Sequence, residues 1–97
     1  MERKEGEIIN LSDLEMDLLD EIYFVTSFHE ITEELEKEPV LIKKALDKLI
    51  RIGYIYQMSY DETKNDFEKN DTPDYIFMEK YSYLASKRGL FAHNTIR

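Results

Sequence analysis

One segment, residues 39–55, constrains the fold of this 97-residue chain more than any other. Pro39 suits the first position of a helix, because the N–H that proline lacks would have no partner there. Gly53 can adopt the left-handed conformation that ends a helix, and the residues after it alternate as in a strand. Between these two residues the apolar positions recur at helical spacing: Ile42, Ala45, Leu46 and Leu49. The segment therefore predicts a helix over residues 39–52 that turns at once into a strand.

Two shorter helices are predicted before this segment. Ser12 and Glu15 have the spacing of a capping box, which predicts a helix from about residue 13 to about residue 25. Ser27 and Glu30 repeat that spacing and predict a second helix that ends before the proline. The apolar residues expected to face the core of the two helices are Leu14, Leu18, Leu19, Ile22, Val25, Ile31 and Leu35.

The rest of the chain is predicted to form a ribbon and a final helix. A strand over residues 54–60 would place four side chains on one face: Tyr54, Tyr56, Met58 and Tyr60. Residues 61–74 are polar and rich in turn formers, so we expect a long mobile loop there, followed by a second strand over residues 75–83. Ser86 is the expected cap of the last helix, although Gly89 costs about 1 kcal/mol relative to alanine inside a helix.

This order of elements resembles the winged helix-turn-helix domain found in many small transcriptional regulators. Residues 31–35 and 39–55 carry the resemblance best, as second helix, recognition helix and first wing strand. The resemblance covers about residues 12–90. It implies an α+β fold with a three-helix core, a β-hairpin wing and a short C-terminal helix. We therefore expect a charged N-terminal arm over residues 1–10 and a single domain over residues 11–97.

The net charge of −8 is distributed unevenly along the chain. Residues 1–38 contain thirteen acidic and three basic groups, and residues 53–78 contain six acidic and two basic groups. Residues 39–52 and residues 79–97 each contain four basic groups and one acidic group. The predicted third helix and the C-terminal segment are therefore basic regions of an acidic protein, whose remaining surface is expected to be solvated.

DNA binding by the outward face of the third helix is the function that the resemblance implies. The basic side chains that would contact phosphates are Lys43, Lys44, Lys48, Arg51, Lys87 and Arg88. Double-stranded DNA would then be the partner of a transcriptional regulator, and a homodimer is expected. Two features oppose this interpretation: residues 39–52 contain no Asn, Gln, Ser or Thr to read bases, and the predicted wing is acidic.

A protein-interaction adaptor that does not bind DNA is the alternative. The end of the third helix has more apolar residues than one buried stripe needs, and the ribbon is rich in tyrosine. The residues that would form this interface are Leu41, Ile50, Ile52, Tyr56 and Tyr60. The same side chains can instead pack against the wing or the first helix, so both interpretations stay open from the sequence.

Catalysis is not expected. The chain has no cysteine, its three glycines are isolated, and its two histidines, His29 and His93, lie on different predicted elements. We therefore predict no catalytic residue, no cofactor and no metal site. No apolar run approaches the roughly 20 residues that span a bilayer, and the charged N-terminal residues lack the apolar core of a signal peptide. A cytoplasmic protein without a membrane partner is the expectation.

Overall fold

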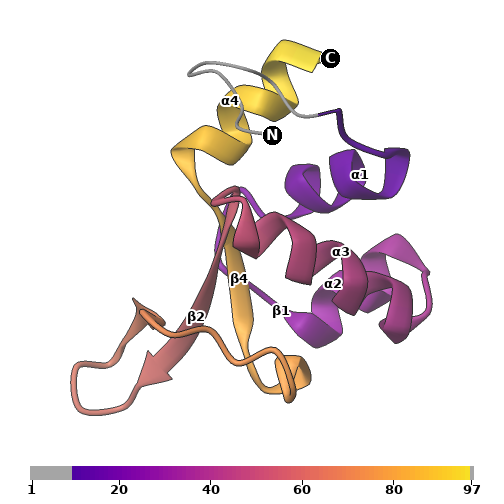
Figure 1. Ribbon diagram of the computed structural model, residues 1–97. Helices are drawn as coiled ribbons and strands as arrows, with labels where there is room; N and C mark the ends of the chain where they lie inside the picture. Colours follow the sequence, from indigo (N-terminus) through magenta and orange to yellow (C-terminus); the bar gives the residue numbers. More distant parts are fainter. Residues whose placement is uncertain (1–9, 97) are drawn as a thin grey trace.

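Four α-helices and a four-stranded antiparallel sheet form the α+β fold of residues 10–96, the part of the chain that the computed structural model describes. Figure 1 shows α1, α2 and α3 on one side of β2 and β4, and α4 beyond the end of the sheet. The elements are α1 (Asp13–Glu21), β1 (Thr26–Ser27), α2 (Phe28–Leu35), α3 (Pro39–Arg51), β2 (Ile55–Asp61), β3 (Asp66–Lys69), the 3-10 helix η1 (Met78–Lys80), β4 (Ser82–Ala85) and α4 (Lys87–Ile96). The predicted N-terminal arm, apart from its last residue, lies outside the described residues.

Both predicted capping boxes are present. The Ser12 hydroxyl accepts from the Glu15 N–H at 3.2 Å, and the Glu15 carboxylate accepts from the Ser12 N–H at 2.9 Å. Ser27 and Glu30 make the same two bonds, at 3.1 and 3.2 Å. These side chains satisfy backbone donors that have no partner within the first turn of a helix, and they fix where α1 and α2 begin.

The first helix is shorter than predicted. It ends at Glu21, one turn before Val25, and the chain enters the two-residue strand β1, which the sequence did not predict. The Thr26 hydroxyl donates to the Phe24 carbonyl at 2.7 Å and lies 3.4 Å from the Glu21 carbonyl. Thr26 itself pairs with Tyr83 of β4. Pairing with a distant strand therefore replaces the last predicted turn.

The third helix follows the prediction closely. Pro39 is its first residue, it ends at Arg51, and Gly53 has the left-handed φ of +83° that the sequence predicted. The Tyr54 N–H closes the turn by donating to the Leu49 carbonyl at 2.8 Å. Side chains from the helices, η1 and the sheet form one core, whose most deeply buried members are Leu18, Leu19, Ile22, Ile31, Ile42, Leu46, Leu49, Ile55, Met78 and Tyr83.

The sheet differs from the predicted two-stranded ribbon. Its order is β1-β4-β2-β3, so β2 pairs with β4 over residues 55–58 and with β3 over residues 58–61. The predicted loop over residues 61–74 contains β3, and the predicted strand over residues 75–83 is irregular backbone and η1 until Ser82. The turn between β2 and β3 contains Asn65 at a positive φ of 54°, a conformation that asparagine adopts more readily than most residues.

The end of α3, the start of β2 and the start of α4 meet at one junction. Ser86 caps α4, as the sequence predicted. Its hydroxyl accepts from the Gly89 N–H at 3.0 Å and donates to the Gly53 carbonyl at 2.7 Å. A Cβ atom on Gly89 would lie 2.2 Å from the Tyr54 carbonyl oxygen. Glycine is therefore required here because α4 approaches the backbone before β2, and this contact outweighs its poor helix propensity.

A Gly89→Ala substitution should lower the free energy of unfolding by roughly 1–3 kcal/mol, because the backbone must move to admit the methyl group. At an exposed helix position without such a close contact, replacing glycine by alanine would instead raise the free energy of unfolding by about 1 kcal/mol. Urea denaturation of the wild type, Gly89→Ala and the exposed first-turn control Lys87→Ala tests this. A Gly89→Ala variant as stable as Lys87→Ala would contradict the close approach.

Candidate interaction surface

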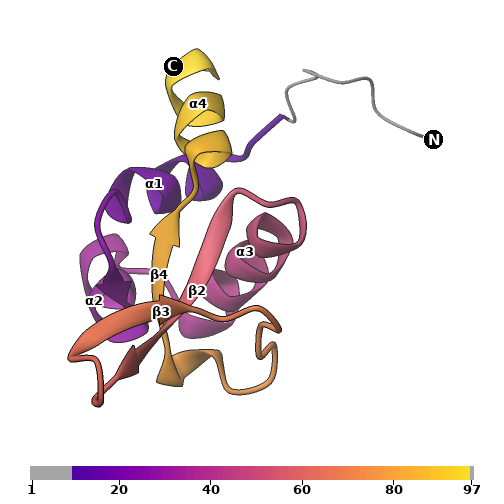
Figure 2. The ribbon, with the colours of Figure 1, turned by 90° about the vertical axis from the view of Figure 1, so that its left-hand side faces the viewer.

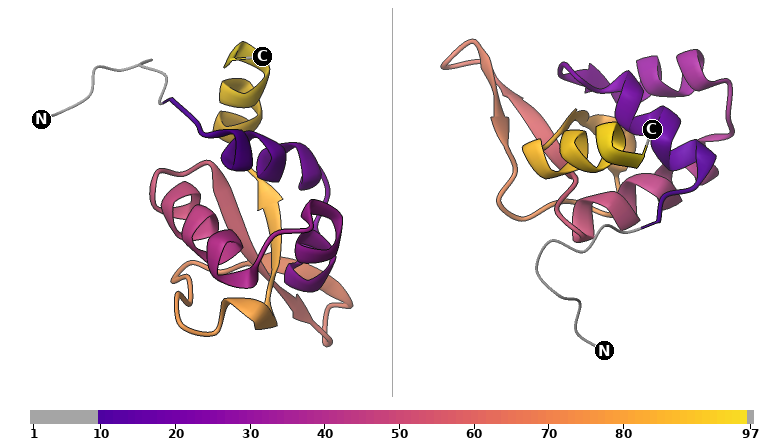
Figure 3. Two further views of the ribbon diagram at one scale, coloured as in Figure 1. Left: turned by 90° about the vertical axis from the view of Figure 1, so that its right-hand side faces the viewer. Right: turned by 90° about the horizontal axis from the view of Figure 1, so that it is seen from above.

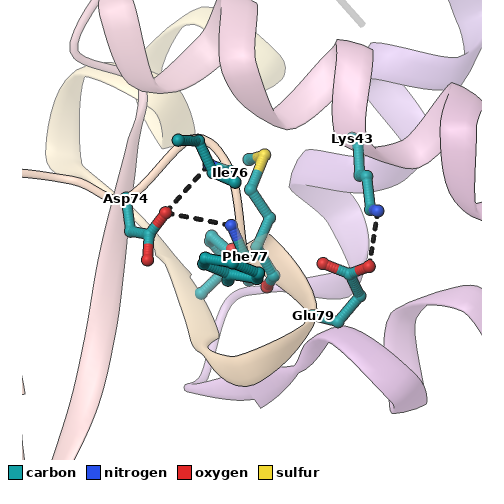
Figure 4. Close-up of polar contacts among 7 residues, drawn as sticks. Lys43, Asp74, Ile76, Phe77 and Glu79 are labelled. Atoms are coloured by element: carbon teal, nitrogen blue, oxygen red, sulfur yellow. Dashed lines mark hydrogen bonds and ion pairs between the residues drawn. The ribbon is translucent and has the colours of Figure 1, made fainter.

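The exposed side of α3 lies beside the segment between β3 and β4, residues 70–81, which we call the connection. Figures 2 and 3 show both on the same side of the molecule, with α2 on the other side. Two contacts join them. The Lys43 ammonium is 2.5 Å from the Glu79 carboxylate (Figure 4), and the Arg51 guanidinium lies 4.0 Å from the centre of the Tyr75 ring. We refer to the surface formed by α3 and the connection as the α3 face.

The buried amide of Gln57 on β2 holds the connection in place. Its Nε2 donates to the Asp74 carbonyl at 2.8 Å and to the Tyr83 hydroxyl at 3.2 Å. Its Oε1 accepts from the Asn70 side chain and from the Asp74 N–H, both at 2.8 Å. Both donor hydrogens and both acceptor positions of the amide are therefore used. Because an unpaired buried amide is costly, this network specifies one path for the connection.

The Asp74 side chain shapes the next turn of the connection. One carboxylate oxygen accepts from the N–H groups of Ile76 at 2.8 Å and Phe77 at 2.9 Å (Figure 4), and the other accepts from the Tyr81 hydroxyl at 3.0 Å. The backbone bonds from Phe77 and Ile76 are the main reason why the pKa of Asp74 is lower than usual. The turn presents two large apolar side chains to solvent, with 76% of Ile76 and 55% of Phe77 exposed.

The basic side chains of α3 are mostly paired with carboxylates. Lys43 pairs with Glu79 and lowers its pKa. Lys48 lies 2.9 Å from the buried carboxylate of Glu15.

Arg51 is hydrogen-bonded to Asp47, which raises the pKa of the arginine. Lys44 is exposed, and it has no ion pair within residues 10–96. The phosphate-binding surface predicted for α3 is therefore largely neutralised by the protein itself.

Of the two basic residues predicted on the last helix, Arg88 lies near the C-terminal end of α3. Lys87 and Arg88 are both exposed on the first turn of α4. The Arg88 guanidinium lies 5.9 Å from the centre of the Tyr54 ring and would contact a Cβ at Gly53. The structure thus brings Arg88 close to the C-terminal end of α3.

Of the five residues predicted for a protein interface, Ile50 is buried in the core and adds no exposed apolar surface, and Ile52 is half-buried against the core. Leu41 is exposed on α3. Tyr56 and Tyr60 are exposed on β2, where Lys69 lies over the Tyr56 ring and Phe67 packs edge-on against Tyr60.

Sequence reasoning missed the most exposed apolar residues of the α3 face. These are Val40, Ile76 and Phe77. The sequence analysis predicted a strand over residues 75–83, in which half of the side chains would be buried. The available sign was that Ile76 and Phe77 follow, after Tyr75, the sequence Thr72-Pro73-Asp74, which favours a turn.

The outer edge of the sheet is poorly suited to adding a strand from a partner. All four residues of β3 are exposed, and they include Asp66, Glu68 and Lys69. The N–H of Phe67 donates to the Asp66 carboxylate at 2.7 Å instead of to another strand. Charged side chains are one feature by which natural edge strands avoid further pairing.

A pocket of about 250 Å³ lies between the C-terminal end of α3 and the strands β2 and β3. Ile50, Ile55 and Pro73 contribute its apolar lining. The side chains of Gln57 and Asn70 also line it, but their amides are engaged with each other and with the connection. Within the described residues, no group of three or more His, Cys, Asp or Glu side chains is placed to hold a metal ion.

Comparison of the chain with protein-family models, with curated proteins and with solved structures gives no match. None of the helices in residues 10–96 combines the length and apolarity needed to cross a bilayer.

A Gln57→Leu substitution should lower the free energy of unfolding by roughly 2–4 kcal/mol, because the Asp74 backbone and the Asn70 amide lose their buried partner. Ser59→Ala is the control. It removes one bond to Asn70 and should cost about 1 kcal/mol. Urea denaturation compares the three proteins, and equal losses for Gln57→Leu and Ser59→Ala would contradict a special role for Gln57.

Asp74 should make the connection sensitive to acid. Its pKa is below the ordinary 3.8, so its ionised form stabilises the fold above that pH, and the contribution is lost as the pH falls through the lower folded value. The melting temperature of the wild type should exceed that of Asp74→Asn at pH 6, and the difference should shrink as the pH falls below 3.8. Thermal unfolding at several pH values measures it, and a difference independent of pH would refute the assignment.

Proposed function

We propose that this domain is a winged-helix module that binds another protein through the α3 face. Three helices precede the main strands, and residues 36–38 join α2 to α3 as a turn joins the two helices of a helix-turn-helix. The paired strands β2 and β4 occupy the place of a wing, and α4 follows them. These features support the winged-helix assignment. Fold alone does not decide the partner, so the choice rests on the α3 face.

The exposure of Ile76 and Phe77 on a firmly hydrogen-bonded turn is the observation that favours a protein partner. Exposed apolar side chains at the surface of a domain are typical of protein interfaces, and large side chains seated in a partner's pocket supply much of the binding energy. The Asp74 carboxylate already fixes the turn that carries them. Binding would therefore lose little conformational entropy in this segment.

DNA binding is the second candidate, favoured by the basic side chains on the exposed side of α3. Surface ion pairs contribute little stability, so Lys43 and Arg51 can exchange their carboxylate partners for phosphates, whereas Lys48 would have to leave the buried carboxylate of Glu15. Lys44 and, beyond the end of the helix, Lys87 and Arg88 would add further contacts. Against this, the carboxylates of Asp47 and Glu79 lie on the same surface and would repel the phosphates.

Replacing both Ile76 and Phe77 by serine should abolish capture of the partner protein. The matched control is Phe91→Ser, which changes a phenylalanine that is 66% exposed on α4. Tagged wild type, double variant and control are cross-linked in extracts of the source cells, and the captured proteins are compared by mass spectrometry. A protein captured by the wild type and the control but lost with the double variant is expected. Identical captures for all three would refute the proposed surface.

Random-sequence duplex DNA should not bind the domain at micromolar concentration, even in about 50 mM salt, where attraction to phosphates is least screened. Fluorescence anisotropy measures this for the wild type and for a variant with Lys44 and Lys48 replaced by alanine. Binding that weakens steeply at about 200 mM salt, and is reduced in the variant, would instead establish DNA as the partner.

A further inference from the structure

We propose that the partner of the α3 face is a second copy of this chain, and that each copy inserts its Phe77 ring into the pocket of the other. The inference rests on the proposed function, because it names the partner of the same surface. The α3 face carries a projecting apolar turn, Ile76-Phe77, and is bordered by a hollow. A surface that has both a projection and a matching hollow can be complementary to its own copy.

The pocket is the hollow at the border of the α3 face. The end of α3 and the connection supply five of its lining residues: Ile50, Gly53, Asn70, Asp71 and Pro73. Its volume is about 250 Å³. An apolar cavity of about 150 Å³ accepts benzene, so this pocket has room for an aromatic ring against its apolar lining.

The turn has the properties of a preformed projection. Ile76 and Phe77 are exposed, and the Asp74 carboxylate accepts from both of their N–H groups, at 2.8 and 2.9 Å (Figure 4). Seating the ring in the pocket removes apolar surface from water while the backbone that carries it is already fixed. A large side chain held in this way is typical of the residues that dominate protein interfaces.

The positions of the turn and the pocket favour a closed dimer. The turn is followed by Glu79, which pairs with Lys43 in the N-terminal half of α3, whereas the pocket lies at the C-terminal end of that helix. A two-fold axis in the plane of contact, midway between the turn and the pocket, places each turn over the pocket of the other copy. Both contacts then form together, and the assembly ends at two copies.

The charges beside the two features are complementary. The Lys80 ammonium lies 4.8 Å from the centre of the Phe77 ring, and Asp71 lines the pocket. Neither residue makes an ion pair with another side chain in residues 10–96. When Phe77 of one copy enters the pocket of the other, Lys80 approaches Asp71 of the other copy. Opposite charges at the edge of a contact help to fix its orientation.

Sedimentation equilibrium of the purified full chain measures this self-association. The wild type should dimerise with a dissociation constant of roughly 10 μM, near the weak end of the range for specific interfaces. Replacing Ile76 and Phe77 by serine should raise the constant by roughly tenfold or more, because both contacts lose their apolar side chains. Phe91→Ser changes an exposed phenylalanine of α4 and is the matched control, which should dimerise as the wild type does.

A charge exchange tests the pocket side of the contact. Asp71→Lys and Lys80→Glu each place like charges at both contacts, so each should weaken the dimer several-fold. The variant with both substitutions should regain the affinity of the wild type, because each contact again joins opposite charges. Both side chains are exposed, so the fold should survive these changes.

The outcomes separate this inference from the proposed function. A wild type that stays monomeric at roughly 500 μM would overturn the inference, since even a weak specific dimer forms at that concentration. Equal dimerisation of the serine variant, or a double charge variant no tighter than the single ones, would also overturn it. If the wild type is monomeric but a different protein from the cell extracts is lost with the serine variant, the proposed function stands with that partner. If the captures are identical as well, both proposals fail.

Discussion

The amide of Gln57 is the interaction on which the outer part of this fold depends. It is buried on β2 and is hydrogen-bonded to the N–H and the carbonyl of Asp74, to Asn70 and to Tyr83. Because it is completely buried, any other path of the connection would leave polar groups without partners. Gln57 thus fixes the backbone of Asp74, whose carboxylate in turn shapes the apolar turn before η1.

The connection in turn determines the character of α3. A wing that left the helix free would expose a basic surface, but here Glu79 and Tyr75 lie against Lys43 and Arg51. Together with the Lys48 contact to Glu15, this leaves a surface of mixed charge next to exposed apolar groups. Such a combination fits recognition of a protein better than recognition of a uniformly negative polymer.

The features predicted correctly from the sequence are those decided by residues a few positions apart. Capping boxes, the proline at the start of α3 and the left-handed Gly53 all depend on neighbours within about one helical turn. The features missed depend on distant partners. β1 exists because Thr26 meets Tyr83, and the connection is irregular because Asp74 meets Gln57. In the sequence the network is indicated only by Gln57, a polar residue at a position that the structure buries.

The candidate surface was predicted less well for the same reason. The basic residues of α3 were identified correctly as exposed on one face, with Lys43 only partly so, but their ion pairs join residues far apart in the chain. The sequence left open whether Ile50 and Ile52 are exposed or packed, because one apolar stripe already accounts for a buried side of the helix. In the structure β2 packs against α3, and Ile50 is part of the core.

The Glu15 carboxylate gives the two ends of this molecule a mechanical connection. One of its oxygens accepts both the Ser12 N–H, which fixes the entry of the chain into α1, and the Lys48 ammonium on α3. Any partner that draws Lys48 away removes one of the two restraints on that oxygen. The same carboxylate therefore links the start of α1 to the exposed side of α3.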